Sequence, residues 1–125
     1  MKIPIWIRWI AVFAWMAVIF CFSAQAHSNE VTKAYFGDFN YWVRKGGHVS
    51  EYAVLFVLAR WASGADWRAF IIAVLYACTD EWHQTFVAGR TGTPADVLID
   101  SIGPLLVCAR NLPKALHIMF EGSGE

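Results

Sequence analysis

The stretch from Cys78 to Asp100, CTDEWHQTFVAGRTGTPADVLID, concentrates ionisable side chains where two apolar segments meet. The apolar runs AFIIAVLYA and SIGPLLVCA lie directly before and after it. A soluble domain could carry these charges on a surface loop, whereas a membrane protein must pair each of them or turn it away from lipid. The choice between these two classes decides the fold. The ionisable residues of the stretch are Asp80, Glu81, His83, Arg90, Asp96 and Asp100.

The composition favours a membrane protein. Of 125 residues, 58% are hydrophobic and 16% are charged, whereas soluble domains carry about 25% charged residues. The formal net charge is zero, so no basic field indicates a nucleic-acid partner. The three cysteines lie in or beside apolar runs without a disulfide or zinc spacing, which indicates packing residues. The length favours a single domain over residues 1–125.

The first apolar segment, Ile3–Phe22, is long enough to cross a bilayer, which takes about 20 residues. The sequence Ala24-Gln25-Ala26 behind it resembles a signal-peptide cleavage site, so a removable signal is the alternative. Signal-peptide cores are shorter, at about 7–15 residues, so the length favours a retained transmembrane helix.

Three further apolar runs are shorter than a membrane span and reach full length only by taking in polar residues. The alternative is a soluble bundle, but YAVLFVLARWA and AFIIAVLYA are apolar on every side and lack the polar stripe of a soluble helix. The tail over 113–125 has the apolar spacing of a short interfacial helix. The sequence therefore predicts an all-α, integral membrane bundle of four transmembrane helices, at about 3–22, 41–62, 67–87 and 95–112.

The basic residues of the connecting segments indicate that both termini face the cytoplasm. This topology places nearly every ionisable residue within a span at the same depth, in the outer leaflet, and leaves the inner halves of the helices apolar. Basic residues expected inside are Lys2, Arg8, Arg60, Arg68, Arg110 and Lys114, and those expected outside are Lys33, Arg44, Lys45 and Arg90.

Three- and four-residue spacing places these polar residues on single helix faces. Exposing carboxylates to lipid is costly, so the faces should turn toward one another and form a polar pocket in the outer leaflet. One face carries Arg44, Lys45, His48 and Glu51; a second carries Asp80, His83 and Gln84, with Glu81 about a quarter-turn away; and a third carries Asp96 and Asp100.

Each of these residues also has a plain structural explanation. Arg44 and Lys45 could anchor a helix at the interface, and His48 and Glu51 could form an ion pair within one helix. Asp96 suits a helix N-cap, and GRTGTP suits a tight loop because glycine permits unusual backbone angles. Their convergence on one pocket is what favours a function.

A histidine paired with a carboxylate suits a general base near neutral pH. His48-x-x-Glu51 and Asp80-x-x-His83 could also bind a metal on one helix face, but this spacing is common by chance and no metal site is predicted. Arg90 with Arg44 or Lys45 could hold a phosphate or carboxylate. Reaction type and cofactor stay open. The candidate catalytic residues are His48, Glu51, Asp80, Glu81 and His83, and the candidate substrate-binding residues are Ser23, Gln25, Arg44, Lys45, Gln84, Arg90, Asp96 and Asp100.

The segments IFCFSAQ, RKGGHVSEYAVL and YACTDEWHQTFVAGRTGTPADVLIDSIG closely resemble the VanZ-like family of small bacterial membrane proteins. The resemblance covers roughly Trp9 to Val107. Two departures are mild, since Ala24 replaces a common Ser and Ala88 a common Pro. The family's polar motif positions correspond to Ser23, Gln25, Arg44, Lys45, His48, Glu51, Tyr52, Asp80, Glu81, His83, Gln84, Arg90, Asp96 and Gly103.

The resemblance implies a multi-pass protein of the bacterial cytoplasmic membrane, in a family whose founding member is linked to teicoplanin resistance. The first hypothesis is that the outer pocket binds or modifies a lipid-linked cell-envelope component and so affects glycopeptide susceptibility. The alternative is a non-enzymatic scaffold or a module that antagonises a lipoglycopeptide. A proton or cation pathway ranks lowest, because the apolar inner halves offer no continuation for it.

Overall fold

A computed structural model of the chain describes residues 2–25, 28–87 and 94–110, nearly all of them helical. The all-α prediction is thereby confirmed. After a turn at Ser101 the chain continues as a helix over residues 102–110. The elements are α1 (Ile5–Ser23), α2 (Ser28–Phe36), the 3₁₀ helix η1 (Gly37–Phe39), α3 (Asn40–Ser63), α4 (Asp66–Gln84) and α5 (Pro94–Asp100).

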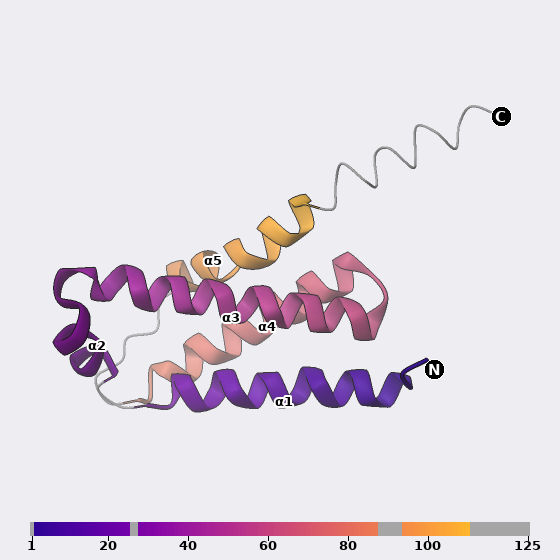
Figure 1. The fold of residues 1–125 in the computed structure, drawn as a ribbon, viewed down its shortest axis with the longest axis horizontal. Coiled ribbons are helices and arrows are strands. Elements are labelled where there is room, and N and C mark those ends of the chain that lie inside the picture. The colour runs from indigo at the N-terminus through magenta and orange to yellow at the C-terminus, as the bar shows by residue number, and fades with distance from the viewer. Residues whose placement is uncertain (1, 26–27, 88–93, 111–125) are drawn as a thin grey trace.

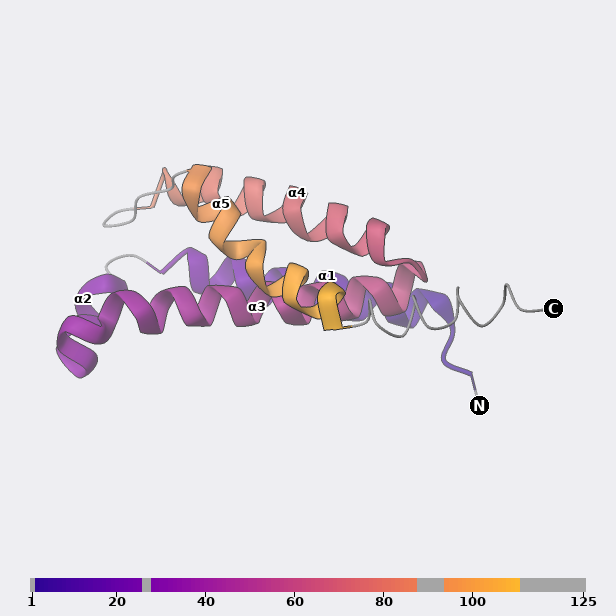
Figure 2. The same ribbon diagram turned by 90° about the horizontal axis from the view of Figure 1, so that it is seen from above.

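Helix α3 is the centre of the fold, since it packs against α1, α2, α4 and α5. The helices α1, α3 and α4 run in alternating directions, and α5 runs in the same direction as α3 (Figure 1). Figure 2 shows the same bundle from above, with α2 at one end and the turn between α3 and α4 at the other. The last turns of α1 and α4 and the first turns of α3 and α5 therefore share the end that holds α2.

The turn between α3 and α4 follows from a glycine in a left-handed conformation. Gly64 has a φ of 77° and donates its N–H to the carbonyl of Arg60 at 2.8 Å, which ends α3. Arg60 also pairs with Asp66 at the start of α4. Arg68 donates to the carbonyl of Ser63 at 3.3 Å, so both sides of the turn are tied together.

Five alanines of α3 and α4 are buried, beside the larger Tyr52, Leu55 and Phe56, while many other large apolar side chains are exposed. Among the exposed large apolar residues in the helices, the exposed fraction is 63% for Phe13, 62% for Leu75, 73% for Leu98 and 63% for Leu106. A water-soluble domain buries such residues, whereas membrane helices pack through small ones. The small buried residues are Ala59, Ala62, Ala69, Ala73 and Ala77.

The fourth predicted helix is interrupted. Proline has no N–H, so Pro104 cannot donate to the carbonyl of Asp100 four residues earlier, and its ring crowds that carbonyl. The helix accordingly divides at Ser101. The predicted third helix ends earlier than expected, at Gln84, and α2 is a helix where the sequence predicts only a loop. The predicted interfacial helix over 113–125 lies outside the described residues.

Among the helices of the described residues, α1 alone is long and apolar enough to cross a membrane. Only 11% of its apolar window is buried, so α1 is not a core helix. Helices α3 and α4, with 24 and 19 residues, are about 36 and 28 Å long at 1.5 Å per residue. Both have the length for a span, and charged residues lower their apolar character. The four-span bundle stays a prediction.

The contact at Gly103 yields a test of the packing. A Cβ at this position would lie 2.3 Å from the carbonyl oxygen of Val49 and 3.0 Å from the backbone nitrogen of Ala53. Neither atom can move without shifting α3, so Gly103→Ala should lower the free energy of unfolding by about 1–3 kcal/mol or more. The measurement is equilibrium unfolding in detergent.

Gly46→Ala is the matched control, because nothing lies within 4 Å of a Cβ there. Alanine inside a helix should stabilise the chain by about 0.5–1 kcal/mol relative to glycine. Equal stability of Gly103→Ala and the unmodified chain would contradict the close approach of the two helices.

Candidate functional site

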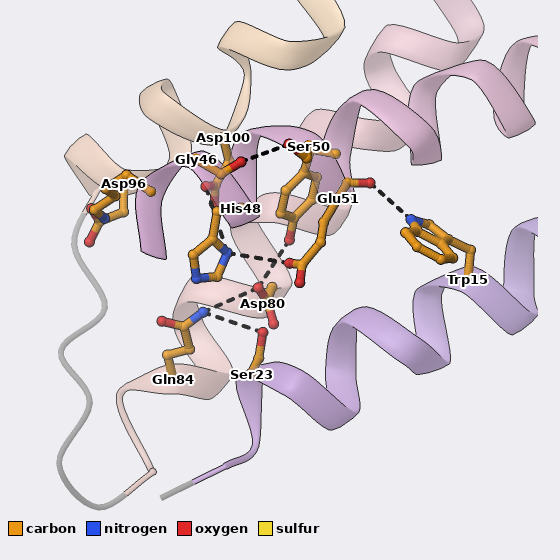
Figure 3. Close-up of polar contacts among 12 residues, drawn as sticks. Trp15, Ser23, Gly46, His48, Ser50, Glu51, Asp80, Gln84, Asp96 and Asp100 are labelled. Carbon is orange, nitrogen blue, oxygen red and sulfur yellow. Dashed lines mark hydrogen bonds and ion pairs between the residues drawn. The ribbon is translucent and has the colours of Figure 1, made fainter. Parts of the chain in front are cut away.

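Polar side chains from α1, α3, α4 and α5 meet at the end of the bundle that holds α2 (Figure 3). This arrangement confirms that residues far apart in the sequence converge, as the helix faces predict. The sequence also predicts that they share a depth in the outer leaflet, and that stays a prediction. We call the following group the polar cluster: Ser23, Lys45, His48, Glu51, Tyr52, Asp80, Glu81, Gln84, Asp96 and Asp100.

A buried hydrogen-bonded chain joins three helices at the base of the polar cluster. Tyr52 donates its hydroxyl to Oδ2 of Asp80 at 3.0 Å. Gln84 donates Nε2 to the same oxygen at 3.2 Å and to the hydroxyl of Ser23 at 3.4 Å. All four side chains are buried. Asp80 thus receives two donors, which are worth about 1.5–3 kcal/mol each when the acceptor is charged.

His48 lies between two carboxylates from different helices. Its Nδ1 is 3.7 Å from Oε2 of Glu51, one turn along α3, and 4.0 Å from Oδ1 of Asp100 on α5. The ion pair within α3, which the sequence offered as a structural explanation for these two residues, is therefore present when His48 is protonated. A second carboxylate reaches the same nitrogen from the facing helix, so one imidazole links the two elements (Figure 3).

Asp100 is the most deeply buried acid of the polar cluster. It is 1% exposed, and neither of its carboxyl oxygens accepts a hydrogen bond among residues 2–25, 28–87 and 94–110. Its carboxyl lies against that of Glu81, which is 6% exposed. A buried acceptor without a donor costs about 1–3 kcal/mol. Asp100 therefore differs from Asp80, whose position the hydrogen bonds of Tyr52 and Gln84 explain.

Asp96 is not the N-cap that the sequence suggested as one explanation. Helix α5 begins at Pro94, which suits the first position because its N–H would have no partner there. Asp96 lies inside the first turn and pairs with Lys45 of α3. The pair is half-buried, with side-chain exposures of 21% for Lys45 and 16% for Asp96. It ties the start of α5 to α3 at the edge of the polar cluster.

The buried face of α4 differs in one residue from the predicted face. Asp80, Glu81 and Gln84 are buried, in line with Ala77 one turn earlier. His83, predicted to share the face, turns toward α1, where its ring centroid lies 4.4 Å from that of Phe20. The buried residues Ala77, Asp80, Glu81 and Gln84 follow one another at three- and four-residue intervals and so form one helix face. Glu81 belongs to this buried face, and His83 lies at its edge.

Two predicted binding residues, Gln25 and Arg44, are described but are not members of the polar cluster, and a third lies outside the described residues. Gln25 follows the end of α1 and is exposed. Arg44 is half-buried on α3 and has an interaction of its own. Arg90, together with the loop GRTGTP up to residue 93, lies outside the described residues, and so do the roles predicted for them.

Two residues that sequence reasoning did not place among the site residues hold the polar cluster in position. Tyr52 is fully buried and donates to Asp80. Trp15 of α1 donates Nε1 to the backbone carbonyl of Glu51 at 2.9 Å, which fixes α1 against α3 at this level. Tyr52 could have been found from its spacing, because it follows His48 by one helical turn and so lies on the same face of α3. No sequence signal points to Trp15.

The polar cluster can accept hydrogen bonds and move protons. Asp80, Glu81 and Asp100 supply acceptor oxygens in a buried setting, and His48 can exchange a proton with a carboxylate beside it. Within the described part of the chain, no three His, Cys, Asp or Glu side chains are placed to hold a metal ion. The catalytic and binding roles of individual residues stay predictions.

The profile of the VanZ/LLP1 family matches residues 8–109, most of the chain. The match includes every residue of the polar cluster. The chain therefore belongs to the VanZ/LLP1 family, which confirms the resemblance seen in its motifs. Searches of the curated proteins and of the solved structures find no match.

The hydrogen bond between Tyr52 and Asp80 gives a test of the buried chain. Tyr52→Phe keeps the ring and leaves Asp80, 3% exposed, with one donor fewer. Because a buried charged acceptor loses a partner, unfolding in detergent should become easier by about 1–3 kcal/mol. Tyr35→Phe is the control, since Tyr35 is 83% exposed. Equal effects of the two substitutions would rule out the buried bond.

Proposed function

We propose that the chain, as a member of the VanZ/LLP1 family, is a multi-pass membrane protein of the bacterial cytoplasmic membrane. We further propose that its polar cluster binds or modifies a lipid-linked component of the cell envelope. In this proposal four helical segments cross the bilayer with both termini in the cytoplasm, and the polar cluster lies in the outer leaflet. The resulting phenotype would be altered susceptibility to glycopeptides of the teicoplanin type.

The distribution of apolar residues supports the membrane part of the proposal. Large apolar side chains are exposed on α1, α3, α4, α5 and the helix over 102–110, including Phe13, Val57, Leu75, Leu98 and Leu106. Exposed large apolar side chains on five helical segments suit contact with a membrane or a partner. Small residues at the α3–α4 interface suit helices that pack in lipid, where van der Waals contact replaces the hydrophobic effect.

The burial of Asp100 is the observation that carries the binding part of the proposal. An unpaired charge in the membrane costs about 2.5–3.5 kcal/mol at the bilayer centre. The two hydrogen bonds that Asp80 accepts can offset a cost of this size. Asp100 accepts no such hydrogen bonds from the described residues; its polar neighbours are the imidazole of His48 at 4.0 Å and the carboxyl of Glu81. Buried ionisable groups in membranes mark functional sites by default, because nothing structural favours them.

The residues around Asp100 suit a polar head group. Asp100 and Glu81 offer carboxyl oxygens to the hydroxyl or amide donors of a sugar or peptide. Lys45 adds a cation at the edge for a phosphate or carboxylate. His48, between Glu51 and Asp100, is the candidate general base if the bound component is also modified. A lipid-linked envelope precursor combines these chemical groups with an apolar tail.

Near-isosteric substitutions test the proposal. Asp100→Asn and Glu81→Gln should leave the amount of folded protein in the membrane unchanged, because each amide keeps the size of the acid and can still hydrogen-bond to the neighbouring carboxyl. Both should shift the lipid-linked precursor pool and the teicoplanin susceptibility of the host toward those of a deletion strain. Asp38→Asn, on the exposed 3₁₀ helix, removes the same charge elsewhere and should behave as the unmodified protein.

A non-enzymatic scaffold is the second candidate, favoured by the hydrogen-bonded chain from Ser23 through Gln84 and Asp80 to Tyr52. In that case the polar cluster only holds the helices together, and Asp100→Asn should lower the amount of folded protein. Folded protein with normal precursor pools and normal susceptibility would count against binding or modification at the cluster.

A further inference from the structure

An apolar groove lies at the end of the bundle opposite the polar cluster. It has a volume of about 370 Å³ and runs between the start of α1, the end of α3 and the start of α4. One wall is Ile5 and Trp9, the floor is Ala62, and the other wall is Trp67 and Ile71. The mouth carries one charged side chain, Arg68. Such a shape accepts a single hydrocarbon chain beside a cation.

Positive charge collects around this groove. Arg8 of α1 donates a hydrogen bond to the carbonyl of Trp61 at 3.3 Å. Its guanidinium carbon lies 5.4 Å from the centre of the Trp61 ring. Arg60 and Arg68 flank the turn between α3 and α4. The one acid that the described residues place at this turn, Asp66, is paired with Arg60. The charge of this end is therefore positive and complementary to an anion.

Arg68 is held where it can meet an anion without losing its present contacts. Its guanidinium donates one hydrogen bond to the carbonyl of Ser63 and lies 5.2 Å from the centre of the Trp67 ring. A guanidinium has five N–H donors, so most of them stay available for a phosphate oxygen. Trp67 is 63% exposed beside it, as expected for an aromatic residue at the level of lipid head groups.

We infer that this groove binds an anionic phospholipid, with one acyl chain in the groove and the phosphate on Arg68. Basic sites between membrane helices on the cytoplasmic side hold lipid head groups in this way. The site lies away from the polar cluster and goes beyond the function proposed for it, and it shares only the placement of the chain in a membrane.

Native mass spectrometry of the purified full chain in detergent tests the inference, with phosphatidylglycerol or phosphatidylcholine of identical acyl chains added. The unmodified protein should retain phosphatidylglycerol in preference. Arg68→Gln should weaken that retention about fivefold, as expected for one basic residue at a lipid surface. Lys33→Gln, which removes the same charge from α2 at the far end, should retain the preference.

A second pair of variants separates a seated lipid from general surface charge. Ile71→Trp fills the groove from α4 while every arginine stays, and Ile5→Trp fills it from α1; both positions are exposed enough to accept the larger ring. Either should reduce phosphatidylglycerol retention as Arg68→Gln does.

Three outcomes would overturn the inference: equal retention of the two lipids, an equal loss in Lys33→Gln, or unchanged retention in both groove-filling variants. Glu81→Gln should leave lipid retention intact. The function proposed for the polar cluster and the lipid site inferred at the groove are therefore tested by different variants, so one can fail without the other.

Discussion

The close approach of two backbones at Gly103 is the constraint on which the rest of the structure depends. The helix over 102–110 lies so near α3 that a Cβ at Gly103 would overlap the carbonyl of Val49. Asp100 precedes Gly103 by about one turn, and His48 is the neighbour of Val49. The short distance between helices therefore carries the carboxyl of Asp100 to 4.0 Å from the imidazole of His48. With a larger residue at Gly103, the two side chains would belong to separate surfaces.

The residues that form the polar cluster also explain why α3 and α4 lack the composition of an ordinary membrane span. Lys45 lies in the second turn of α3 and Glu51 at its middle, and Asp80 and Glu81 lie in the last two turns of α4. Between these residues and the charged turn at Arg60, Asp66 and Arg68, both helices are mainly apolar and expose large side chains such as Val57 and Leu75. A hydropathy profile averages along one helix and cannot register that these charges face other helices. The free-energy cost of burying these charges depends on which way their side chains point in the bundle. The two hydrogen bonds that Asp80 accepts lower that cost.

The sequence predicted the long helices and the convergence of the polar residues, because both follow from local periodicity, but it did not predict α2. The spacing of His48 and Glu51, and of Asp96 and Asp100, was enough to place them on single faces. The spacing alone did not predict side-chain positions that depend on contacts between helices. His83 packs on Phe20 of α1, and Asp96 pairs with Lys45 of α3 instead of capping α5. The break at Ser101 had a local cause in Pro104 that the periodicity obscured. The hydrogen bond from Trp15 to the backbone carbonyl of Glu51 leaves no pattern in the sequence, because every residue has a backbone carbonyl.

Pro104 has a consequence for the chemistry at the other side of the break. The carbonyl of Asp100 loses the amide that would normally donate to it in a continuous helix, and the carboxyl of the same residue accepts no hydrogen bond from the described residues. Together with the free oxygens of Asp80 and Glu81, this leaves lone pairs in excess of N–H and O–H groups. Such an imbalance selects by hydrogen-bond polarity: a molecule that brings hydroxyls, amides or an ammonium gains partners at these oxygens, and one that offers only acceptors gains none from them.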